Sequence, residues 1–202
     1  MKYEVIKVCG MREGENIRAV EALGIDWMGF IFWGKSSRFV SKLPTYLPTK
    51  AKRVGVFVNE NLEQLKRIVD DYSLDIIQLH GSESPEFAQQ LRDRVVIKAF
   101  SIATIDDLEQ TKPYAGVVDF FLFDTKAQLP GGNGQQFDWN ILENYDGDTP
   151  FLLSGGIGPD DSEHVCNFHH PRCIGIDLNS RFESEPAIKD VVALRRFLSQ
   201  LS

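Results

Sequence analysis

The sequence predicts an α/β protein that forms a single-domain (β/α)8 TIM barrel spanning residues 1–202. Three observations support this prediction: apolar runs of strand length recur about every twenty-five residues, helical patterns alternate with them, and eight such units can be counted. Eight parallel strands with crossover helices close a barrel, and 202 residues lie at the low end of its usual length. An open doubly wound sheet is the alternative, but no Gly-x-Gly-x-x-Gly follows the first strand.

Each predicted strand is a short run of apolar and β-branched residues, closed by a polar residue, a glycine or a turn. With their closing residues, the runs are Glu4–Gly10, Trp27–Phe32, Arg53–Val58, Asp75–Gly81, Val95–Ala99, Phe120–Asp124, Phe151–Gly156 and Cys173–Asp177.

The connecting segments carry helical spacing or helix-start signals. Gly24 is a plausible glycine after the end of the first helix, and Ser84 followed by Pro85 is typical of a helix start. We expect helices over Asn16–Leu23, weakly over Ser41–Leu47, over Leu62–Val69, after Ser84, from about Ile105, near Trp139–Leu142, from Pro159–Asp161, and over Val191–Leu198.

Composition narrows the class of protein. A net charge of −7 without a Lys/Arg cluster argues against nucleic-acid binding. Three cysteines do not make a disulfide framework. The segment Met1–Glu4 lacks a signal peptide's apolar region, and no apolar run approaches membrane-spanning length. We therefore expect a cytoplasmic protein without a membrane segment, and both a monomer and a homodimer fit the sequence.

In a parallel barrel the carboxyl ends of all strands face one mouth, where chemistry collects. Cys9 ends the first strand, and its alternative role is that of a small buried hydrophobe. Asp124 directly follows four apolar residues, so it is placed at the rim of a buried strand. A carboxyl group in that position suits a general acid, although a helix cap or turn aspartate is the alternative.

The seventh and eighth strands end in a candidate phosphate site. Gly155 and Gly156 allow backbone N–H groups to approach an anion, and barrels often bind phosphate there. Asn179 and Ser180 could donate to phosphate, whereas Asp177, an acceptor, suits a sugar hydroxyl.

Two further side chains are candidate site residues, and each has an alternative role that is purely structural. Arg38 ends a small polar loop and could clamp a carboxylate with two parallel hydrogen bonds, or be a solvated surface arginine. His80 is either a site residue or a histidine satisfied at a strand end. Metal binding is not expected, because the spacing of Cys166, His169, His170 and Cys173 matches none of the common zinc patterns.

Short segments along nearly the whole chain resemble, in order, those of the phosphoribosylanthranilate isomerase family of tryptophan biosynthesis. They are Lys7–Gly10, Gly29–Phe32, Lys35–Val40, Gly55–Asn59, Gln78–Gly81, Leu122–Asp124, Gly131–Gly134, Phe137–Trp139, Ser154–Gly156 and Gly175–Asp177.

This resemblance implies an Amadori rearrangement of N-(5-phosphoribosyl)anthranilate to 1-(2-carboxyphenylamino)-1-deoxyribulose 5-phosphate, without a cofactor. It makes Asp124 the general acid at the ring oxygen and Cys9 the general base at C2′. It further implies that Arg38 holds the anthranilate carboxylate. Phosphate would be held by Gly155, Gly156, Asn179 and Ser180, and ribose hydroxyls by Asp177.

The chain departs from the family pattern at two places. Asn133 stands where many relatives have threonine, and Arg181 stands where glycine is commoner. The second departure puts the geometry of the phosphate site in question, although Arg181 could add a charged contact.

Other functions remain open at this point. A metal-dependent epimerase would need His and carboxylate ligands at several strand ends, and only His80 is suitably placed. A lyase on a sugar phosphate would use a Schiff-base lysine, for which Lys98 is the candidate. A non-catalytic ligand-binding barrel would not need Cys9 and Asp124 together.

Overall fold

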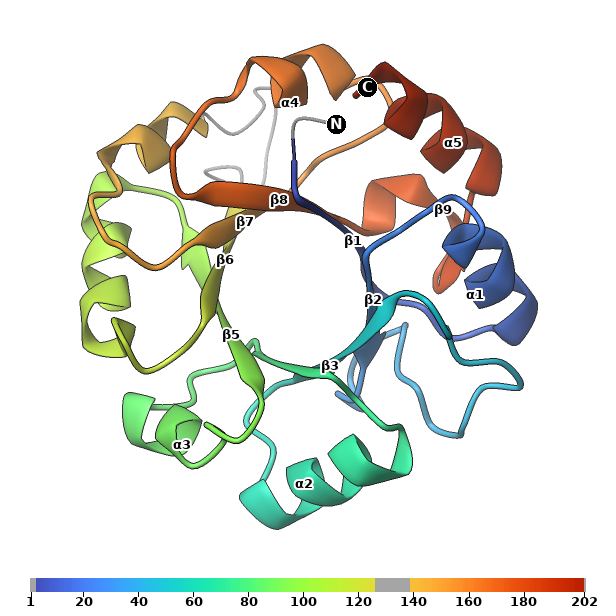
Figure 1. Ribbon diagram of the computed structural model, residues 1–202, viewed down its shortest axis with the longest axis horizontal. Coiled ribbons are helices and arrows are strands. Elements are labelled where there is room, and N and C mark those ends of the chain that lie inside the picture. Colours follow the sequence, from blue (N-terminus) through green and yellow to red (C-terminus); the bar gives the residue numbers. More distant parts are fainter. Residues whose placement is uncertain (1–2, 126–138, 202) are drawn as a thin grey trace.

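The computed structural model describes residues 3–125 and 139–201. They form a closed barrel of eight parallel strands in chain order, with β8 pairing to β1 (Figure 1). The predicted fold class is therefore confirmed. The strands are β1 Val5–Val8, β2 Trp27–Ile31, β3 Lys52–Phe57, β4 Ile76–Leu79, β5 Val95–Ile102, β6 Phe120–Thr125, β7 Phe151–Ser154 and β8 Cys173–Leu178.

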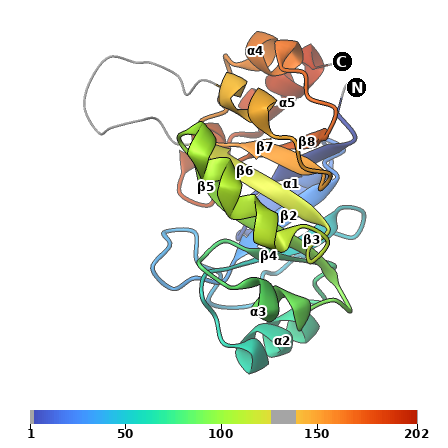
Figure 2. The same cartoon turned by 90° about the vertical axis from the view of Figure 1, so that its left-hand side faces the viewer.

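Helices surround the outside of the barrel (Figures 1 and 2). The α-helices are α1 Gly14–Glu21, α2 Leu62–Asp71, α3 Pro85–Gln89, α4 Ser162–Asn167 and α5 Val191–Gln200, and the 3₁₀ helices are η1 Ile105–Tyr114, η2 Trp139–Asn144 and η3 Ser180–Phe182. A small hairpin of β9 Glu183–Glu185 and β10 Ile188–Lys189, which the sequence did not predict, precedes α5. Among the described residues, no helix is long and apolar enough to cross a membrane.

The weak helix predicted over Ser41–Leu47 is wrong, because the structure has no helix there. Pro44 lies in the middle of the segment and Pro48 follows it, and a proline in a helix interior removes a hydrogen bond and clashes with the preceding turn. The chain crosses from β2 to β3 without a helix, while Tyr46 and Leu47 pack against the core.

The helix predicted from Ile105 exists, but it is the 3₁₀ helix η1. A capping box between Thr104 and Asp107 starts it, and Pro113 lies inside it. With ten residues it is long for a 3₁₀ helix, since such helices are usually short connecting pieces.

The barrel interior is built in layers that place the polar side chains at one end. An apolar cluster fills the layer nearer the amino ends of the strands; its members are Val5, Trp27, Val54, Ile76, Ile97, Ala99, Leu122 and Leu152. Side chains two residues apart on a strand share a face. Four polar side chains each lie two residues beyond a member of this cluster and therefore face the interior nearer the carboxyl ends of the strands; they are Lys7, Gln78, Asp124 and Ser154.

Candidate active site

A pocket of about 390 Å³ opens at the carboxyl ends of the strands. Eight of the nine residues predicted for the site line it: Cys9, His80, Asp124, Gly155, Gly156, Asp177, Asn179 and Ser180. Arg38, the ninth, is not among the lining residues, although its neighbour Ser36 is. The structure thus gathers residues from β1, β4, β6, β7 and β8 at one concave surface.

Cys9 follows β1 directly and is 4% exposed, with the pocket on its accessible side. The space for the thiol depends on Gly29, because a Cβ at Gly29 would lie 2.6 Å from the Cys9 Sγ. Lys7 lies below it, fully buried, and its Nζ donates to Asp177 Oδ1 at 2.9 Å. Register explains this pair, because Lys7 is opposite Asp177 in the β1–β8 ladder.

The charges around the thiol oppose one another. Burial raises the pKa of Cys9 above its ordinary value, while the ammonium groups of Lys7 and Lys189 favour the thiolate. Burial also works against the charge on Lys7, but the Asp177 carboxylate outweighs it and holds the pKa of Lys7 above its ordinary value. Lys7 therefore stays charged beneath Cys9, which stays a thiol at neutral pH.

Asp124 and His80 face each other across the mouth, with His80 Nε2 3.8 Å from Asp124 Oδ2. Gln78, on the same face of β4, places its Nε2 2.8 Å from His80 Nδ1. With Gln78 donating to Nδ1, the proton of the neutral imidazole lies on Nε2, toward Asp124. His80 is thus oriented as a hydrogen-bond donor to the carboxylate or to a ligand beside it.

We expect His80 to remain neutral throughout the working pH range. Its side chain is 36% exposed, but partial loss of hydration among the surrounding residues, followed by the charge of Lys7, lowers its pKa to about 4. Because the folded pKa lies below the unfolded value of about 6.5, this group's contribution to stability is lost as pH falls from about 6.5 through 4. An NMR titration of the His80 ring protons, assigned with His80→Gln, should give a midpoint near 4; a midpoint near 6.5 would contradict the neutral assignment.

The loops after β7 and β8 form another side of the pocket. Gly155 and Gly156 have φ of +90° and +70°, a region that L side chains rarely adopt. Arg181 Nη1 donates to the Gly156 carbonyl oxygen at 2.9 Å and so joins the two loops. The arginine that replaces the family's usual glycine therefore lies beside the candidate phosphate site and contacts it.

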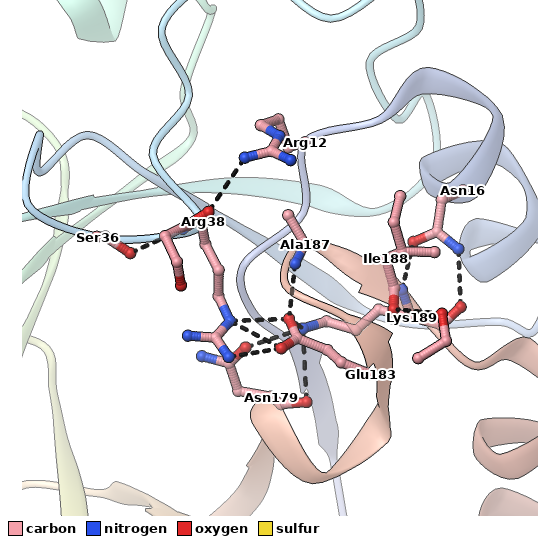
Figure 3. A network of polar contacts seen from close by, with 11 residues as sticks. Arg12, Asn16, Ser36, Arg38, Asn179, Glu183, Ala187, Ile188 and Lys189 are labelled. Atoms are coloured by element: carbon pink, nitrogen blue, oxygen red, sulfur yellow. Dashed lines mark hydrogen bonds and ion pairs between the residues drawn. The ribbon is translucent and has the colours of Figure 1, made fainter.

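Arg38 lies in a polar network next to the pocket (Figure 3). Its Nε and Nη2 donate to both carboxylate oxygens of Glu183 at 2.5–3.0 Å, and Lys189 Nζ donates to Glu183 Oε1 at 2.5 Å. Lys189 Nζ also donates to Asn179 Oδ1 at 2.8 Å. Glu183 and Lys189 could not be predicted from the sequence, because they lie on the small β9–β10 hairpin rather than at the end of a barrel strand, and no local pattern marks them.

The predicted absence of a metal site concerned four residues that run from α4 to the start of β8, namely Cys166, His169, His170 and Cys173. Among the residues that the structure describes, no group of three or more His, Cys, Asp or Glu side chains is arranged to hold a metal ion. His170 instead contacts the Tyr145 carbonyl oxygen at 3.1 Å. The segments Gly131–Gly134 and Phe137–Asp138, which entered the family resemblance, lie outside the described residues.

Comparisons with known proteins agree along almost the whole chain. A family model described as N-(5'phosphoribosyl)anthranilate (PRA) isomerase matches residues 6–200. N-(5'-phosphoribosyl)anthranilate isomerase of Parabacteroides distasonis is 52% identical over 205 residues, covering 98% of this chain and 93% of that protein.

Solved structures of phosphoribosylanthranilate isomerases are also similar to this chain. A phosphoribosyl anthranilate isomerase in complex with reduced 1-(o-carboxyphenylamino)-1-deoxyribulose 5-phosphate superimposes with a TM-score of 0.84 at 29% identity, covering 98% of this chain and 97% of the other. Monomers generated from the dimeric enzyme of Thermotoga maritima give a TM-score of 0.81 at 28% identity, with coverage of 98% and 97%.

Proposed function

Because this chain belongs to the phosphoribosylanthranilate isomerase family, we propose that its pocket uses Cys9 and Asp124 to carry out the family's reaction. The protein is an isomerase that converts an aldose to a ketose in tryptophan biosynthesis, with N-(5-phosphoribosyl)anthranilate as its small-molecule substrate. The observation that carries the residue assignment is that both side chains line one pocket, next to the two loops after β7 and β8.

The two proton transfers need an acid and a base at different substrate atoms. Asp124 protonates the ring oxygen as the C1′–O bond breaks, which opens the furanose. Cys9 then removes the C2′ proton, and the resulting enol-amine tautomerises to the ketose. In the barrel order, β7 and β8 separate the strands that carry Asp124 and Cys9, and this separation supports their action on different substrate atoms.

The two ends of the substrate carry the anionic groups. We assign the phosphate to Gly155, Gly156, Asn179 and Ser180, with Arg181 adding positive charge at the loop junction. We assign the ribose hydroxyls to Asp177, which also accepts from Ser154 Oγ at 3.3 Å. We assign the anthranilate carboxylate of the substrate to Arg38, which lies beside Ser36 and Asn179 at the edge of the pocket.

The lyase alternative depends on Lys98 acting as a nucleophile. Lys98 is 3% exposed, and its Nζ donates to the Gly81 carbonyl oxygen at 2.6 Å and to Glu83 Oε2 at 3.2 Å. An ammonium held by these acceptors anchors the loop after β4. This arrangement disfavours a Schiff base and supports the isomerase assignment.

The function is tested by turnover of phosphoribosylanthranilate with purified protein treated with a chelator. We expect full conversion to the ketose without added metal or cofactor, measured by chromatographic separation of substrate and product. Absence of turnover by correctly folded protein, with or without metal, would overturn the proposal. Light scattering on the same sample distinguishes the two proposed oligomeric states, monomer and homodimer. We also propose that the protein is located in the cytoplasm.

A further inference from the structure

Glu183 is a buried carboxylate held between two cations beside the pocket (Figure 3). Its side chain is 5% exposed, that of Lys189 is fully buried, and that of Arg38 is 21% exposed. Burial opposes the charge on Glu183, but hydrogen bonds from Arg38 and Lys189 outweigh it and keep its pKa below the ordinary value. Glu183 is therefore ionised.

The network leaves positive charge uncompensated. One carboxylate, Glu183, faces two cations, Arg38 and Lys189, so the trio carries a net positive charge. Glu183 is the first cause that raises the pKa of Arg38 above its usual value, so the guanidinium stays charged. A further anion at the edge of the pocket would complete the charge balance of the trio.

The geometry shows where that anion can bind. A planar guanidinium has two edges that suit a carboxylate, one formed by Nε and one Nη, the other by the two Nη atoms. Glu183 occupies the edge of Nε and Nη2. Covalent geometry then directs Nη1 and the second hydrogen of Nη2 away from Glu183, so the second edge of Arg38 can receive another carboxylate.

Close packing keeps Arg38 in this position. A Cβ on Gly10 would lie 2.6 Å from Arg38 Cδ and 2.7 Å from Asn179 Oδ1, so the arginine stem passes directly over the residue after Cys9. The backbone nitrogen of Arg38 donates to Ser36 Oγ at 3.1 Å. Because Ser36, Cys9 and Asn179 line the pocket, the network lies against the pocket's wall.

We propose that Glu183 is a positioning residue that holds Arg38 by one edge and presents the other edge to the carboxylate of the substrate. Lys189 supports the arrangement by supplying the second charge that keeps Glu183 ionised and by holding the Asn179 side chain. The inference rests on the proposed role of Arg38. It predicts that Glu183 affects recognition of the carboxylate and leaves recognition of the phosphate unchanged.

The experiment compares two ligands that differ only in the carboxylate: reduced 1-(o-carboxyphenylamino)-1-deoxyribulose 5-phosphate and its counterpart made from aniline. Calorimetry gives the Kd of each for the wild type, Glu183→Gln, Arg38→Lys and the double variant. Glu183→Gln should weaken binding of the carboxylated ligand about tenfold, the scale of one charge-assisted hydrogen bond. Its Kd for the aniline ligand should be unchanged, which also shows that the site is folded.

The remaining variants separate the possible outcomes. Arg38→Lys keeps the charge but lacks the two-edged guanidinium, so it should lose the same preference, and adding Glu183→Gln should cause no further loss. Glu185→Gln, an exposed glutamate on the same strand, should bind both ligands as the wild type does. If Glu183→Gln does not fold, Glu183→Asp, whose carboxylate is one methylene shorter, should show the same selective loss.

Two results would overturn the inference. Unchanged or tighter binding of the carboxylated ligand by Glu183→Gln would show that Glu183 does not position Arg38, and tighter binding would mean that it competes with the substrate. If instead Arg38→Lys discriminates between the ligands as the wild type does, the proposed role of Arg38 fails first. The two failures are therefore distinguishable.

Discussion

Asp124→Asn is expected to lower kcat by about 10²–10⁴-fold, the usual contribution of a positioned general acid. Asparagine keeps the size and hydrogen-bonding reach of the side chain but has no acidic proton to transfer to the ring oxygen. KM should change little, because the groups proposed to bind phosphate and carboxylate lie on other elements. Steady-state kinetics with phosphoribosylanthranilate measure both constants.

The control for this variant is Asp70→Asn, which changes an exposed aspartate at α2, outside the mouth of the barrel. It should retain wild-type kinetics. A kcat for Asp124→Asn within tenfold of the wild type would contradict the role of Asp124. His80 would then be the next side chain to examine, because its Nε2 lies 3.8 Å from the carboxylate.

Most of the barrel could be predicted from sequence because its strands are buried on both sides. Such strands appear as continuous apolar runs, as in Phe120–Phe123, and the residue that closes each run marks the mouth. The connection between β2 and β3 could not be predicted in this way. Tyr46 and Leu47 are partly buried against the core without forming a helix, so their apolar character resembled a helical pattern.

The site residues also divide into those that could be predicted from the sequence and those that could not. Residues at strand ends, such as Cys9, Asp124 and Asp177, could be located because register and alternation fix where their side chains point. The partner of Arg38 could not, because Glu183 lies 145 residues away on a small hairpin. Whether an arginine is solvated or held by a buried carboxylate depends on contacts that no local pattern encodes.

Cys9→Ala is expected to lower kcat by about 10²–10⁴-fold, because alanine removes the base assigned to the C2′ proton. Burial raises the pKa of Cys9, so only a small part of the thiol is ionised at neutral pH. The thiolate fraction grows about tenfold per pH unit below that pKa. The wild-type rate of proton abstraction should therefore rise between about pH 7 and 9, and the residual rate of Cys9→Ala should lose this rise.

Substrate deuterated at C2′ tests specifically the removal of the C2′ proton. The wild type should show a primary isotope effect wherever proton abstraction limits the rate. Cys166→Ala, which changes a cysteine on α4 whose Sγ lies near the Gln200 carbonyl oxygen, serves as the control and should keep both the rate and its pH dependence. If Cys9→Ala retained the wild-type rise with pH, the titrating group would be another residue. Because Lys7 lies directly beneath the thiol and carries its charge there, Lys7→Met would then test whether that ammonium controls the profile.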